Sequence, residues 1–102
     1  MQIYDIFLHT PLGKKKGELK AKIENGKLSG VLSVLGHTEP IEGTVDTNGR
    51  CSLKGKIISL MKSIDFTANG TIDYHAVYLA INGNTGYYEI LGELRSQKER
   101  ES

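Results

Sequence analysis

The chain has 102 residues, with 13 Lys and Arg side chains against 12 Asp and Glu side chains and a formal net charge of +1. This length holds one domain with one core, and the even charge argues against a nucleic-acid binder, which shows a basic face. The start of the chain lacks the basic and apolar regions of a signal peptide, and no apolar run approaches the ~18 residues that span a bilayer. Cys51 is the single cysteine, so no internal disulfide can form. We therefore expect a cytoplasmic protein without membrane or nucleic-acid partners.

Apolar and polar residues alternate along most of the chain, and clusters of turn residues interrupt the alternation at short intervals. This period of two is typical of the strands of β-sandwiches and barrels. It predicts eight strands, at residues 2–10, 18–24, 27–34, 39–45, 50–59, 63–72, 76–82 and 85–95. The predicted fold is all-β, a single antiparallel up-and-down meander of about eight strands closed into a small barrel over residues 1–95. The charged segment 96–102 is predicted to be a disordered tail.

Two connections carry strong turn signals. Asn25-Gly26 suits a two-residue type I′ turn, because both residues tolerate a positive φ, and Asp46-Thr47-Asn48-Gly49 has similar polar turn chemistry. For the third turn, Asn69-Gly70 competes with Asp73-Tyr74-His75. The segment Gly43-Thr44-Val45-Asp46 recurs as Gly70-Thr71-Ile72-Asp73, and in the first copy the turn follows the aspartate. We therefore place the third turn at residues 73–75.

Five of the predicted strands place a glycine between two apolar residues at a spacing of two, so that the glycine shares the inward face with them. The five are Gly30, Gly43, Gly55, Gly70 and Gly92. Glycine weakens a strand, but it is useful where the strands of a small barrel bend and approach each other closely. The pattern therefore favours a tightly closed barrel, with these glycines pointing inward or lying at strong bends.

The segments Gly17-Glu18-Leu19, Gly26-Lys27-Leu28-Ser29-Gly30 and Glu42-Gly43-Thr44-Val45-Asp46 resemble hairpins of small lipocalin- and avidin-like (calycin-like) barrels. The chain is also similar to a group of short, stand-alone, uncharacterised bacterial β-barrel proteins, in which segments like Leu35-Gly36-His37 and Leu60-Met61-Lys62 lie between strands. The resemblance covers nearly the whole chain. Its motifs are structural turns, so it implies a fold and no activity, and the ligand residues of lipocalins and avidins are not recognisable here.

The chain shows no catalytic or cofactor motif. The three histidines, His9, His37 and His75, have no ligand spacing, and no cluster of Cys, Asp or Glu completes a metal site. Residues 83–86 precede a predicted strand rather than a helix and lack the lysine of a phosphate-binding loop. Cys51 is predicted to be a buried core thiol. We therefore expect neither an enzyme nor a bound metal or cofactor.

In a meander, alternate connections meet at the same end of the barrel. The end opposite the polar turns collects the connections near residues 10–17, 35–38, 60–62 and 82–86, which we expect to be longer and less polar. Barrel mouths are common ligand sites, and loops on a rigid scaffold concentrate binding residues. The candidates for binding an anionic or amphipathic small molecule are His37, Lys62, Lys14, Lys16, Met61 and Leu35, with Lys15, Leu12 and Leu60 beside them. The alternative is that the apolar side chains only plug the barrel.

The first, seventh and eighth predicted strands are apolar on both faces. Such strands are usually buried on both faces, so this wall predicts a homodimer, the commonest soluble assembly. Because the sequence leaves the outward face open, each strand offers two interface candidates: Tyr4 or Phe7, Tyr78 or Leu79, and Tyr87 or Leu91. A flattened barrel, or loops folded over the wall, is the alternative. The leading hypothesis is a structural or interaction module that self-associates, and the second is a small-molecule carrier.

Overall fold

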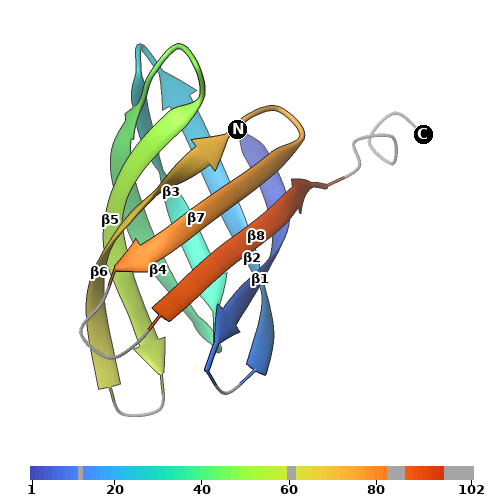
Figure 1. Ribbon diagram of the computed structural model, residues 1–102, viewed down its shortest axis with the longest axis vertical. Helices are drawn as coiled ribbons and strands as arrows, with labels where there is room; N and C mark the ends of the chain where they lie inside the picture. The colour runs from blue at the N-terminus through green and yellow to red at the C-terminus, as the bar shows by residue number, and fades with distance from the viewer. Residues whose placement is uncertain (12, 60–61, 83–86, 96–102) are drawn as a thin grey trace.

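The computed structural model describes residues 1–11, 13–59, 62–82 and 87–95, and Figure 1 shows strands that run up and down around a barrel. The strands are β1 (Gln2–Thr10), β2 (Gly13–Glu24), β3 (Lys27–Val34), β4 (His37–Val45), β5 (Arg50–Ser59), β6 (Lys62–Ile72), β7 (Ala76–Asn82) and β8 (Tyr87–Leu94). Each strand pairs antiparallel with the next, and β8 pairs with β1 to close the barrel. The predicted all-β meander of eight strands is confirmed. The described residues include no helix long and apolar enough to cross a membrane.

β2 and β4 begin earlier than predicted. β2 begins at Gly13 rather than at residue 18, because its register with β1 runs on to the Thr10↔Gly13 pair. β4 begins at His37, because Leu35 and Gly36, with φ of 58° and 80°, form a two-residue turn by themselves. That turn is as short as the one at residues 25–26. The expectation of long loops at this end of the barrel is therefore wrong for the first two connections.

The inward rows of the eight strands form one apolar core that fills the barrel. Its largest fully buried side chains are Tyr4, Ile6, Leu8, Leu19, Leu28, Ile57, Leu79 and Ile90. Cys51 is buried as predicted, and burial raises the pKa of its thiol. The Tyr4 hydroxyl donates to the Asp73 carbonyl at 2.5 Å and accepts from the Gln2 side-chain amide at 3.0 Å. Burial raises the pKa of Tyr4 to about 12.

The five inward glycines lie where neighbouring strands approach too closely for a side chain. A Cβ added to Gly30 would overlap the Lys20 carbonyl oxygen, and one added to Gly70 would overlap the Tyr78 carbonyl oxygen. A Cβ at Gly43 would overlap the Ser52 carbonyl oxygen, and one at Gly92 would overlap the Cγ2 methyl group of Ile6. A Cβ at Gly55 would lie 2.7 Å from the Cγ2 atom of Ile41. The inward placement of all five glycines is confirmed.

The repeated segment has the same turn chemistry in both copies. The Oδ1 atom of Asp46 accepts hydrogen bonds from two backbone N–H groups of its turn, at 2.8 and 3.0 Å. The Oδ1 atom of Asp73 accepts from the N–H groups of His75 and Ala76, at 2.7 and 2.9 Å. Both aspartates therefore fix the turn that follows them, and the third turn at residues 73–75 is confirmed.

Side chains as well as backbone close the barrel between its first and last strands. The backbone N–H of Arg95 donates to the Ile3 carbonyl at 2.8 Å. The Nη2 atom of Arg95 lies 2.6 Å from Asp5 Oδ1 in β1 and 2.5 Å from Glu18 Oε2 in β2. One side chain thus joins the end of β8 to two neighbouring strands. Its hydrogen bond holds the pKa of the Asp5 carboxyl below its usual value.

Candidate functional site

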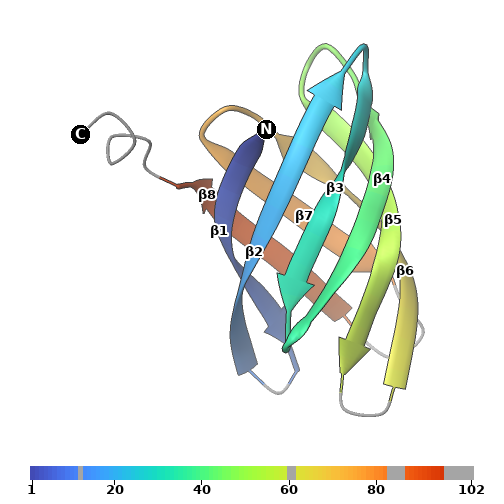
Figure 2. The ribbon, with the colours of Figure 1, turned by 180° about the vertical axis from the view of Figure 1, so that it is seen from behind.

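The barrel wall is interrupted between β4 and β5. β4 pairs with β3, and β5 pairs with β6, as far as the turns that connect them. The pairing between β4 and β5 stops at Glu42↔Lys54. Residues 37–41 of β4 and 55–59 of β5 therefore have a paired neighbour on one side only, and the two strands separate toward this end of the barrel (Figure 2).

Pro40 explains where this pairing stops. The backbone N–H of Val45 donates to the Gly26 carbonyl at 2.9 Å, on the β3 side of β4. Backbone groups alternate in direction along a strand, so the nitrogen of residue 40 points toward β5. Proline has no N–H to donate there, and the continued register would place it opposite Lys56. For this reason prolines in sheets are confined to edges and bulges.

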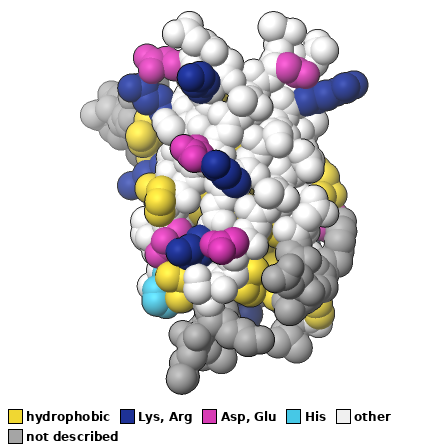
Figure 3. Space-filling view, turned by 90° about the vertical axis from the view of Figure 1, so that its left-hand side faces the viewer, with side chains coloured by type: hydrophobic (Ala, Val, Ile, Leu, Met, Phe, Trp, Pro, Cys, Tyr) yellow, Lys and Arg dark blue, Asp and Glu magenta, His cyan; other side chains and the backbone are white. Residues whose placement is uncertain are grey.

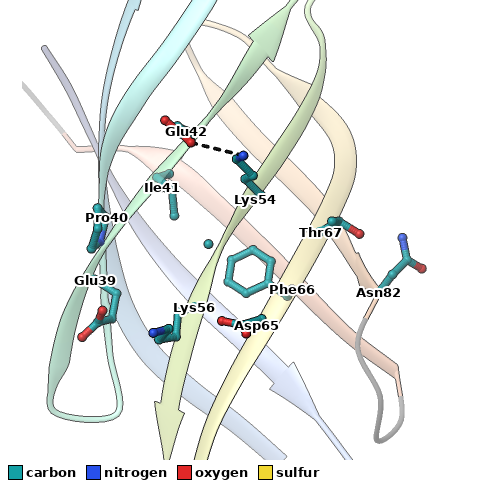
Figure 4. Close-up of a pocket in the computed structure, with 11 residues that line it drawn as sticks. Glu39, Pro40, Ile41, Glu42, Lys54, Lys56, Asp65, Phe66, Thr67 and Asn82 are labelled. Carbon is teal, nitrogen blue, oxygen red and sulfur yellow. Dashed lines mark ion pairs between the residues drawn. The ribbon is translucent and has the colours of Figure 1, made fainter.

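An open groove of about 830 Å³ lies over this interruption (Figure 4). Its floor is apolar and consists of Pro40 and Ile41 from β4 and the ring of Phe66 from β6. Gly55 lies between them, because a Cβ there would be 2.7 Å from Ile41 Cγ2 and 3.1 Å from Phe66 Cζ. Ile41 and Phe66 are each 4% exposed. The groove therefore reaches the edge of the core.

Polar side chains surround this floor. They are Glu39, Glu42, Lys54, Lys56, Asp65, Thr67 and Asn82. At one end of the groove Lys54 Nζ lies 3.4 Å from Glu42 Oε2, and Glu39, Lys56 and Asp65 lie toward the other end (Figure 4). Among the lining residues that the structure describes, two lysines against three carboxylates leave one negative charge in excess. Acidic and basic side chains are also interspersed over the barrel side that lies at left in Figure 1, as Figure 3 shows.

Lys14 and Lys16, two of the lysines predicted to bind a ligand, do not line this groove. Lys14 and Lys16 lie on β2, where it extends past its last pair with β3, Gly17↔Val34. Lysines on an exposed strand edge oppose pairing with another chain, which explains Lys14, Lys15 and Lys16 without a ligand. The Lys14 ammonium also lies 5.0 Å from the centroid of the Phe7 ring.

Leu35 and His37, two of the other predicted ligand residues, lie at the same end of the barrel as Lys14 and Lys16. Leu35 is half-buried and packs against the core, in agreement with the alternative that it plugs the barrel. His37 is exposed at the start of β4. The side chains outside the described part of the chain are those of Lys62, Met61, Leu60 and Leu12. An anion site at this end stays a prediction.

The structure decides which face of the wall formed by β7, β8 and β1 points outward. Tyr4 and Leu79 are on the inward rows, 0% and 2% exposed, so the alternatives that placed them in an interface are wrong. Phe7, Tyr78 and Leu91 point outward and are 41%, 36% and 39% exposed. Phe7 pairs with Leu91, and Leu91 pairs with Tyr78. These three residues form one stripe across the strands, here called the apolar row.

Two predictions remain, one for Tyr87 as an interface residue and one for metal binding. The side chain of Tyr87, the other interface candidate in β8, lies outside those that the structure describes. In the described ranges, no group of three or more His, Cys, Asp or Glu side chains is placed to hold a metal ion.

Sequence patterns missed the groove, including Pro40, Lys56 and Phe66. The available signal was a proline inside a predicted strand, which points to an edge or a break in pairing. That signal did not reveal whether the pairing would stop on the β3 side or on the β5 side of β4.

No protein-family model matches this chain, and no curated protein matches its sequence. Among solved structures, the chain is similar to a redesigned β-barrel, mFAP1, in a structure bound to DFHBI. The TM-score is 0.57 at 14% sequence identity, and the alignment covers 92% of this chain and 92% of that chain. At this identity the likeness shows a shared barrel fold.

Proposed function

We propose that this protein binds a small amphipathic molecule in the groove beside Pro40. The observation that carries the proposal is a groove of about 830 Å³, with an apolar floor, at a break in the barrel wall. This volume lies within the ~300–1,000 Å³ typical of small-molecule sites, which combine apolar walls with a few polar groups. A flat apolar group packs against Ile41 and Phe66, and the polar group of the ligand lies near Lys56 and Asp65.

The fold is compatible with such a role. The similar barrel mFAP1 binds a small molecule. In this chain the inward rows of the strands fill the barrel centre, so the proposed site lies at the side of the barrel. The proposed binding site is therefore at the side of the barrel, whereas the sequence suggested its open end.

Indole, an uncharged flat probe, tests this proposal in an NMR titration of the ¹⁵N-labelled protein. We expect saturable shifts of the amide signals of Gly55, Lys56 and Phe66, because these residues line the groove. In a Thr67→Tyr variant the new ring competes with the probe at the rim, and the affinity should fall severalfold. Thr71→Tyr is the matched control, since Thr71 lies on the same outward row of β6 away from the groove. Shifts confined to another region, or equal losses in both variants, would overturn the proposal.

We propose self-association through the apolar row as a second function. The observation that favours it is that Phe7, Leu91 and Tyr78 are direct neighbours on three adjacent strands. Their exposed parts amount to on the order of 200 Å², whereas each partner in a standard interface buries ~800 Å². A second copy seated on this row would therefore bury a small apolar centre within a larger polar contact. The expected product is a weak homodimer.

Light scattering over a concentration series measures this association. We expect the apparent mass to rise above the 11.2 kDa of one chain as concentration increases. Leu91→Lys should hold the protein at the monomer mass, because it places a charge at the centre of the row. Ile23→Lys replaces another exposed apolar residue, 37% exposed and outside the row, and should associate like the wild type. A constant monomer mass for the wild type would remove this function.

A further inference from the structure

We infer that the molecule bound beside Pro40 is an amphipathic amine, in which a flat apolar group carries a protonated, hydrogen-bond-donating nitrogen. This inference rests on the proposed function and names its ligand class. Two independent features of the groove support it, one in the backbone and one in the side chains.

The backbone feature is the donor that Pro40 lacks. In a continued β4–β5 ladder, residue 40 would donate its N–H to the Lys56 carbonyl, and the register stops two residues before that pair. Proline removes this donor, and a backbone carbonyl at the edge of a core favours a hydrogen-bond partner. A ligand nitrogen in the groove occupies the place of the missing N–H group. A ligand that only accepts hydrogen bonds gains nothing from this carbonyl.

The side-chain feature is an unequal number of charges at one end of the groove. Lys54 is already paired with Glu42 at 3.4 Å. Lys56 remains with two carboxylates, the half-buried Glu39 and the exposed Asp65, at the opposite end (Figure 4). Among the side chains that the structure describes at this end, one lysine does not balance two carboxylates. Charges act more strongly beside a low-dielectric surface such as Phe66. This end of the groove therefore attracts a cationic group and disfavours a carboxylate.

Tryptamine and indole-3-propionate distinguish the two charges, because they share a ring and differ in the sign of the attached group. The chain contains no Trp, so indole fluorescence reports the probe alone. At low salt we expect tryptamine to bind about two- to fivefold more tightly than indole-3-propionate, as for an exposed ion pair. The difference should shrink as added salt screens the charges.

Carboxylate variants locate the origin of this preference. Combining Glu39→Gln with Asp65→Asn should abolish the preference for tryptamine over indole-3-propionate. Glu93→Gln is the control, because Glu93 is an exposed carboxylate on β8 that does not line the groove. It should keep the full preference.

The variant Pro40→Thr tests the backbone feature. Threonine restores the N–H group, so the ladder should extend to Lys56 and the groove should close. We expect tryptamine binding to be lost while the urea midpoint stays equal or rises, and the loss of binding then cannot be attributed to unfolding. Pro11→Thr, in the connection between β1 and β2, replaces the other proline and should bind like the wild type.

The outcomes separate this inference from the function on which it rests. Equal affinities for the two charged probes, or tighter binding of indole-3-propionate, would overturn the amine assignment while indole binding at the groove still stands. Unchanged tryptamine binding in Pro40→Thr would overturn the part assigned to the missing donor. If indole itself fails to shift the groove amides, the proposed function and this inference both fall.

Discussion

At the scale of single residues, glycines set how closely neighbouring strands approach, and they do so in two ways. A Cβ at Gly70 would overlap the carbonyl oxygen of Tyr78, which belongs to the β6–β7 ladder. A Cβ at Gly55 would press on the end of the Ile41 side chain. A side chain can change its rotamer, whereas a ladder carbonyl moves only if its strand moves.

Alanine should therefore have different costs at these two positions. We expect Gly55→Ala to lower the free energy of unfolding by ~1 kcal/mol, and Gly70→Ala to lower it by ~3 kcal/mol or more, because two strands must separate. Urea denaturation followed by circular dichroism measures both. Ser52→Ala, on the exposed outer row of β5, should change stability by less than ~0.5 kcal/mol. Equal losses for the two glycine variants would contradict the distinction between backbone and side-chain contacts.

At the scale of the elements, the closure of the barrel between β8 and β1 depends on ion pairs as well as on backbone pairing. Arg95 contacts Asp5 and Glu18 at the same time, so its guanidinium links strands that are far apart in the sequence. Because Arg95 holds the pKa of the Asp5 carboxyl below its usual value, the charged carboxylate is favoured in the folded protein. Its stabilising effect is complete above the ordinary pKa of about 4 and is lost as the pH falls through the lower folded value.

Replacing Arg95 should therefore change how stability depends on pH and salt. We expect Arg95→Gln to lower the urea midpoint at neutral pH, and to do so less at high salt, because ions screen exposed charges. Below about pH 4 the difference from the wild type should narrow, since Asp5 becomes protonated. Thermal or urea unfolding at several pH values checks this. Arg50→Gln, at the exposed start of β5, should show no such narrowing, and a loss in Arg95→Gln that is constant with pH would exclude Asp5 as its partner.

The strands also show which features of the fold the sequence predicts and which it does not. Alternation and turn residues are local signals, so they predict β1, β3, β5 and β7 with the observed bounds. Lys14–Lys16 have no alternation, and only their pairing with β1 makes them part of a strand. The groove depends on which residue of β5 lies opposite Pro40. That register is a relation between two strands, and neither segment encodes it alone.

At the scale of the whole molecule, every strand pairs with its neighbours in the sequence, except where β8 closes on β1. Closure decides which side of the β7–β8–β1 wall faces the core, because it fixes how the strands curve. The sequence showed that this wall is apolar on both sides. It did not show that Tyr4 and Leu79 would be inside and that Phe7, Leu91 and Tyr78 would be outside. The groove beside Pro40 and the apolar row are thus on different walls, so the function proposed for each can be tested without altering the other.

The hydrogen bond between Arg95 and Ile3 means that the chain leaves the barrel beside the point where it enters. A short linker between these ends, with new ends opened in the turn at residues 46–49, would keep every strand pair while changing the order of the chain. In that circular permutant, β8 and β1 would form an ordinary hairpin. The longest chain separation would then fall on β4 and β5, which share the shortest register in the barrel. The entropy cost of closing the barrel would then oppose the shortest strand pairing. The permuted barrel would therefore open first along the groove beside Pro40.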